Sequence, residues 1–121
     1  MDSDEISTVI EDAILDFTMG DNEIAVSKLE KVLKFDDQQF DAWHALTEIY
    51  YADKENKKAL ESAQKAHQIN AKDVHINTSL SRIWLALGDK EQAEHFGAQA
   101  RMLGWKEELK NPEEDDVIES S

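Results

Sequence analysis

Apolar side chains recur at helical spacing in the middle of the chain. One side of a helix would carry Trp43, Leu46, Ile49 and Tyr50, which are spaced i, i+3, i+6 and i+7. The stretch that follows has the same kind of spacing with smaller side chains, which are Ala59, Leu60, Ala63, Ala66 and Ile69. The pattern therefore predicts two consecutive amphipathic helices. Neither helix can bury its apolar stripe alone, so each needs a neighbour.

This pattern recurs along the chain with a period of 34 residues. Three repeats, at 6–39, 40–73 and 74–107, align without insertion or deletion. The twentieth position of each repeat holds a small side chain that lets two helices approach closely, namely Ala25, Ala59 and Ala93. The tenth, twelfth and thirtieth positions are apolar throughout, the residues being Leu15, Ile49, Ile83, Phe17, Tyr51, Leu85, Phe35, Ile69 and Leu103.

A turn divides each repeat into two helices. The residue pairs at the three expected turns are Gly20-Asp21, Lys54-Glu55 and Gly88-Asp89. Two of these pairs supply the glycine that favours a left-handed helix C-cap. The predicted fold class is therefore all-α, with three helical hairpins that stack because each covers the apolar side of its neighbour.

The repeat pattern breaks near the C-terminus, at Gly104. Residues 105–109 offer one more short helical turn before Pro112, which ends it. The acidic run at 113–116 has no apolar periodicity and is expected to be disordered. We therefore expect a repeat domain over residues 1–107, followed at 108–121 by a short cap and an acidic tail.

Charge narrows the range of partners. The 27 acidic and 13 basic residues give a net charge of −14, which repels phosphate backbones and anionic membrane surfaces. Neither nucleic acid nor a membrane is therefore expected as a partner. The first residues are acidic, and no apolar stretch approaches the ~20 residues of a membrane span. These features predict a cytoplasmic protein.

No residue pattern for catalysis or for a bound cofactor is found in the sequence. The chain has no cysteine, and it lacks the G-x-S-x-G, P-loop, G-x-G-x-x-G and EF-hand spacings. No two of its four histidines have the i, i+4 spacing of a zinc-binding helix, their positions being His44, His67, His75 and His95. We therefore expect no cofactor, no metal and no enzymatic activity.

The repeat resembles the tetratricopeptide repeat (TPR) family over almost the whole chain. The second repeat carries the family's signature side chains at Trp43, Leu46, Tyr50, Ala59 and Ala66. The third carries Leu80, Ser81, Trp84, Gly88, Ala93 and Ala100. The first is degenerate, because Asp12 and Asp16 stand where the family has apolar Leu and Tyr. Terminal repeats are often atypical because one of their faces meets water.

The resemblance implies a right-handed superhelix whose first helices line a concave groove for a peptide. By family position, the groove residues are Ser7, Ile10, Ile14, Phe17, Thr18, Asp41, His44, Glu48, Tyr51, Ala52, His75, Thr78, Arg82, Leu85 and Ala86. The candidates chosen for partner binding are Phe17, His44, Glu48, Tyr51, His75, Thr78, Arg82 and Leu85. A simpler alternative is that Glu48 and Arg82 only pair with each other across adjacent helices.

Family members that hold chaperone tails clamp a C-terminal carboxylate with Lys, Asn and Arg. The matching positions here are Ile10, Ile14, Ala45, His75 and Ser79, so that activity is disfavoured.

Three functions remain open from the sequence. The first is a non-catalytic adaptor or scaffold that binds a peptide or protein segment in the concave groove. The second is a homo-oligomer, assembled through the outer side of the third hairpin around Phe96, Ala100 and Leu103. The third is a regulatory subunit that completes the active site of another protein. A shared scaffold cannot decide among them.

Overall fold

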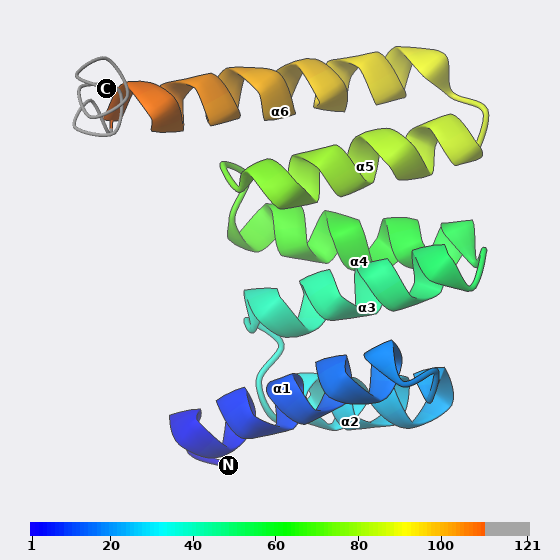
Figure 1. Cartoon of the computed structure of the whole chain (residues 1–121), viewed down its shortest axis with the longest axis vertical. Helices are drawn as coiled ribbons and strands as arrows, with labels where there is room; N and C mark the ends of the chain where they lie inside the picture. Colours follow the sequence, from blue (N-terminus) through cyan, green and yellow to red (C-terminus); the bar gives the residue numbers. More distant parts are fainter. Residues whose placement is uncertain (111–121) are drawn as a thin grey trace, which may run out of the picture.

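A computed structural model describes residues 1–110, and these form six helices (Figure 1). The helices are α1 (Ser3–Thr18), α2 (Asn22–Phe35), α3 (Phe40–Ala52), α4 (Asn56–Ile69), α5 (Val74–Ala86) and α6 (Lys90–Lys110). Residues 1–110 contain no strand, which confirms the predicted all-α class. The predicted acidic tail lies outside the described residues.

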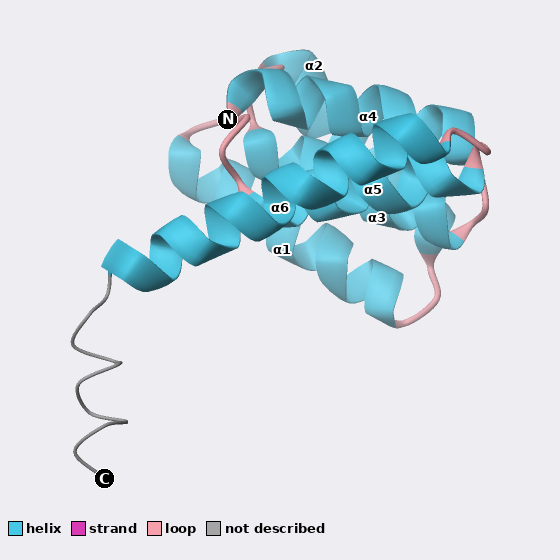
Figure 2. Ribbon diagram, turned by 90° about the horizontal axis from the view of Figure 1, so that it is seen from above, coloured by secondary structure: helices cyan, strands magenta, loops and turns pink. Residues whose placement is uncertain are grey.

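The helices pair in chain order into three hairpins, α1–α2, α3–α4 and α5–α6, which stack one on another (Figure 1). Helix α3 contacts α1 in the hairpin before it and α5 in the hairpin after it. Figure 2 shows α1 on one side of the stack and α2 and α4 on the other. The first helices of successive hairpins are therefore neighbours along one side of the molecule.

Two clusters of buried side chains hold the stack together. The first joins α1, α2 and α3 through Ile6, Ile10, Ala13, Ala25, Leu29, Val32, Leu33, Ala42, Leu46 and Ile49. The second joins α4 and α5 through Ala59, Ala63, Ala66, Ile76, Leu80 and Ile83. The alanines of the twentieth repeat position, Ala25, Ala59 and Ala93, are all buried, as their size predicted. Trp43 packs against both clusters, so it links the two halves of the core.

The turns inside the hairpins all use a left-handed backbone conformation. Gly20 and Gly88 have φ values of 87° and 86°, as the sequence predicted for these glycines. In the second hairpin the equivalent residue is Lys54, with a φ of 61°. A side chain in this conformation costs about 1–2 kcal/mol relative to the right-handed one. The second turn is therefore strained where the other two are not.

Helix α6 is longer than the sequence suggested. It continues through Gly104 to Lys110 without a break, so the separate short helical turn predicted for residues 105–109 is wrong. The physical reason is that glycine inside a helix costs only about 1 kcal/mol relative to alanine and does not by itself end a helix. As a result, the C-terminal part of α6 extends past the N-terminal end of α5 (Figures 1 and 2).

The extended part of α6 exposes a line of apolar side chains. Met102, Trp105 and Leu109 are spaced i, i+3 and i+7, and all three are exposed, Trp105 to 64%. By contrast, Phe96 and Leu103 are half-buried and Ala100 is buried. In the described part of the chain, no helix combines the length and apolarity needed to cross a membrane.

Candidate functional site in the groove between α1 and α3

A groove of about 380 Å³ lies between the first helices of the first two hairpins. Its lining residues come from α1, from α3 and from the residue before α3, and they are Ser7, Ile10, Glu11, Ile14, Phe17, Gln39, Asp41, His44, Ala45, Glu48 and Ile49. The groove is therefore on the side of the stack that the tetratricopeptide resemblance assigned to partner binding.

Helix α1 gives the groove an apolar wall. Ile10, Ile14 and Phe17 are spaced i, i+4 and i+7, so they lie along one side of α1 and all three line the groove. Ile10 is also part of the first core cluster, and Phe17 packs against that cluster. Ile14 remains 45% exposed. Much of its side chain is therefore available to an apolar group of a partner.

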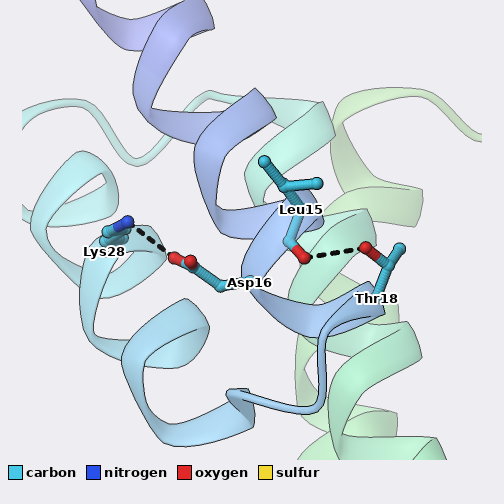
Figure 3. Close-up of polar contacts among 4 residues, drawn as sticks. All are labelled: Leu15, Asp16, Thr18 and Lys28. Atoms are coloured by element: carbon cyan, nitrogen blue, oxygen red, sulfur yellow. Dashed lines mark hydrogen bonds and ion pairs between the residues drawn. The ribbon is translucent and has the colours of Figure 1, made fainter.

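An ion pair fixes α1 against α2 behind this wall. The Asp16 carboxylate lies 2.6 Å from the Lys28 ammonium (Figure 3). The hydrogen bond that Lys28 donates to the Asp16 carboxylate raises the pKa of Lys28 above its ordinary value. At the end of α1, the Thr18 hydroxyl donates to the Leu15 carbonyl at 2.7 Å (Figure 3). The residue that departs from the family signature at position 16 thus makes a polar contact between the helices of the first hairpin.

Helix α3 gives the groove a polar wall. Asp41, Ala45 and Glu48 are spaced i, i+4 and i+7 along one side of α3, and His44 lies beside them. On another side of α3, the Trp43 indole N–H donates to the Asp37 carbonyl at 2.8 Å. That bond ties the start of α3 to the connection from α2, which helps to set how α3 faces the groove.

Helices α3 and α5 are in direct contact with each other. The Ser79 hydroxyl of α5 donates to the Glu48 carboxylate at 3.3 Å. The rings of His44 and His75 stack, with centroids 6.5 Å apart and planes inclined by 17°. His44 and Glu48, which line the groove on α3, are therefore held in place by contacts with α5.

The structure brings together three of the eight candidate residues. Phe17, His44 and Glu48 line the groove. His75 contacts His44 but does not itself line the groove. Tyr51 packs against the second core cluster.

The other three candidates lie on α5 and do not line the groove. The Thr78 hydroxyl donates to the Val74 carbonyl at 3.0 Å within the helix. Arg82 and Leu85 are exposed. Within residues 1–110, Glu48 and Arg82 do not form an ion pair with each other. The simpler pairing suggested by the sequence is therefore replaced by the bond between Glu48 and Ser79.

Four lining residues, Glu11, Gln39, Ala45 and Ile49, were not among the family groove positions. The helical spacing held a signal for the first of them, because Glu11 lies four residues after Ser7 and three before Ile14, on the same side of a helix. Gln39 precedes the helix, and no periodicity indicates its position. Within residues 1–110, no group of three or more histidine, aspartate or glutamate side chains is placed to hold a metal ion.

Comparison with known proteins adds evidence on the fold. No protein-family model and no curated protein matches the sequence. Among solved structures, the Yersinia enterocolitica type III secretion translocator chaperone SycD, in an alternative dimer, is similar with a TM-score of 0.81 and 17% identity, over 98% of this chain and 89% of that one. A chain of the CopN–Scc3 complex gives a TM-score of 0.83 at 13% identity, over 98% of this chain and 70% of that one.

A third similar structure is MamA, with a TM-score of 0.79 and 18% identity, over 84% of this chain and 60% of MamA. At such low identities the similarity shows the fold alone. These neighbours are tetratricopeptide-like helical-repeat proteins, and the chain has their superhelical fold.

Proposed function

We propose that this chain is a three-repeat tetratricopeptide module that binds a segment of another polypeptide in the groove between α1 and α3, as a non-catalytic adaptor or scaffold. The observation that carries the proposal is the groove itself, where a partly exposed apolar wall faces a polar one. Apolar surface beside a few hydrogen-bonding groups is typical of binding sites. In this proposal the repeats are 6–39, 40–73 and 74–107, within a repeat domain over residues 1–107.

The neighbouring structures support a role in protein interaction. SycD is described as a translocator chaperone, and the CopN–Scc3 structure is a complex. Because a shared fold does not determine function, the kind of partner has to be inferred from the surface of this chain itself. A cytoplasmic location remains part of the proposal.

The test uses two adjacent isoleucine and leucine side chains as a matched pair. Ile14 lines the groove, whereas Leu15 does not, and both are well exposed on α1. Lysine at Ile14 places a long charged side chain in the groove, whereas lysine at Leu15 places the same side chain outside it. Neither change removes a buried contact, so both variants should fold like the wild type.

The measurement is affinity capture from native lysate with the wild type and both variants, quantified by mass spectrometry. We expect proteins captured by the wild type and by Leu15→Lys to be lost with Ile14→Lys. Tyr51 is a poor choice for such a test, because it packs against the core. If Ile14→Lys retains the same proteins, the groove is not the binding site.

The exposed line on α6 supports a second candidate function, self-association. Met102, Trp105 and Leu109 form an apolar strip on a helix that extends beyond the rest of the stack. Light scattering of the full chain over a range of concentrations, with Trp105→Ala as the comparison, tests this alternative. Concentration-dependent mass that falls with Trp105→Ala would support it. A monomer at every concentration rules it out.

A further inference from the structure

The groove between α1 and α3 is acidic as well as apolar. Its lining includes the carboxylates of Glu11, Asp41 and Glu48, and it includes no lysine or arginine. The ammonium groups of Lys28 and Lys58 pair with carboxylates outside the groove, those of Asp16 and Glu55. The three groove carboxylates therefore lack a neutralising side chain in the groove.

The arrangement of the carboxylates favours a cationic group. Glu11 belongs to the α1 wall, between Ile10 and Ile14, while Asp41 and Glu48 belong to the α3 wall. Two residues seven positions apart on a helix are separated by about 10 Å along its axis. Negative charges from both walls of a hollow add to one another, and the low-dielectric walls strengthen the field inside. A positive group in the groove is attracted by all three.

The apolar wall of the groove adds a second requirement for the group that binds there. Ile14 is 45% exposed in the groove, next to Phe17, and covering it with an aliphatic group would remove apolar surface from water. A lysine or arginine can satisfy part of both requirements, because its methylene stem lies along apolar surface while its charged end reaches a carboxylate. The groove therefore fits apolar and cationic groups that are close together.

The third hairpin differs in charge from this groove. At the repeat position that holds Glu48 in α3, helix α5 holds Arg82, which is exposed. The acidic character of the lining thus belongs to the first two hairpins. An acidic peptide would be repelled there, and so would a second copy of this chain, which carries a net charge of −14.

We infer that the groove selects a polypeptide segment in which an aliphatic side chain lies beside one or two lysine or arginine residues. This inference rests on the proposed function and specifies the chemistry of the partner segment. Ile10, Ile14 and Phe17 cover the aliphatic side chain, and the carboxylates of Glu11, Asp41 and Glu48 hold the cationic groups.

The experiment is a selection of random short peptides, displayed on phage, against the full chain. Peptides that bind the wild type but not the uncharged variant Ile14→Gln are retained as groove binders. We expect their sequences to be enriched in an aliphatic residue adjacent to lysine or arginine. Groove binders that are acidic or uncharged would overturn this inference and leave the groove as a binding site. Recovery of no peptide that depends on Ile14 would instead contradict the proposed function.

A pair of charge variants then tests the cause of the selection. Glu11→Gln with Asp41→Asn removes two groove charges, and Glu61→Gln with Glu94→Gln removes two exposed charges on α4 and α6. Both double variants change the net charge from −14 to −12. Glu48 is left intact because it accepts a hydrogen bond from Ser79.

The readout is the Kd of a selected peptide synthesised in free form. The groove pair should weaken binding by about three- to tenfold at low salt, as expected for the loss of two exposed ion pairs. The control pair should change it by less than about twofold, and added salt should shrink the difference. Equal effects of the two pairs, or no effect of the groove pair, would overturn the assignment of the cationic site.

Discussion

Helices α1 and α5 are the first helices of the first and third hairpins, yet they bury different positions of the repeat. Ile83 in α5 is 1% exposed, whereas Leu15, at the equivalent position of α1, is 57% exposed. Helix α5 is contacted by α3, α4 and α6, but α1 is contacted by α2 and α3. The repeat thus determines which positions are apolar, while the number of neighbours determines which of them are buried.

The same difference produces the candidate site. Helix α5 lies against α3 with direct contacts, through the bond from Ser79 to Glu48 and the stacked rings of His44 and His75. Helix α1 instead leaves a hollow beside α3, and the partly exposed Ile14 lines it. A terminal hairpin with fewer neighbours can therefore offer apolar side chains to a partner.

The largest expected effect comes from truncating the two equivalent side chains. Ile83→Ala should lower the free energy of unfolding by about 2–5 kcal/mol, because it opens a cavity in the second core cluster. Leu15→Ala should change it by less than about 0.5 kcal/mol, because the leucine is largely in water already. Urea denaturation followed by circular dichroism measures both. Similar losses in the two variants would mean that α1 and α5 are buried alike.

The hairpin turns allow a smaller and opposite change. Lys54→Gly should raise the free energy of unfolding by about 0.5–1 kcal/mol, because glycine adopts the φ of 61° at Lys54 without a steric penalty. Gly88→Ala, at the equivalent turn of the third hairpin, should lower it, because alanine would meet the same penalty. Urea denaturation followed by circular dichroism measures the free energy of unfolding of both variants. A stabilising Gly88→Ala would show that the turns do not share this conformation.

The smallest expected effect concerns the ion pair between α1 and α2. Because Asp16 raises the pKa of Lys28 above 10.5, the pair contributes fully to stability below pH 10.5. Its contribution is lost as the pH rises through the raised pKa of Lys28 in the folded protein. Asp16→Asn should therefore lower the midpoint of denaturation at pH 7, and its difference from the wild type should shrink as the pH rises above 10.5. In α5, the repeat position that corresponds to Asp16 holds Trp84, which packs against the core instead of forming an ion pair.

If the difference in denaturation midpoint between the wild type and Asp16→Asn does not shrink at high pH, the ion pair does not stabilise the fold in this way.

Much of the fold was predictable because it depends on periodicity and side-chain size. The alanines at 25, 59 and 93 are buried, and the glycines at 20 and 88 have the left-handed backbone that their position predicted. The extent of α6 was not predictable from Gly104, because a glycine tolerated within a helix and a glycine that follows one look alike in sequence.

The candidate site was predictable only in part. Family positions placed Phe17, His44 and Glu48 on the side of the stack that holds the groove, and the structure places all three in its lining. The same positions on α5 do not line it, because a repeat pattern treats every hairpin alike while the hollow depends on how neighbouring helices pack. Whether these residues bind a partner remains a prediction.

The central claim is that a polypeptide partner occupies the groove between α1 and α3, and site-specific photocrosslinking in cells tests it most directly. Ser7 lines the groove and its neighbour Thr8 does not, and both are exposed on α1. A photoreactive phenylalanine at Ser7 should give a discrete protein adduct that is lost in the Ile14→Lys background, while the same group at Thr8 should give little. Adducts of equal yield from both positions, or adducts at Ser7 that persist with Ile14→Lys, would contradict the account.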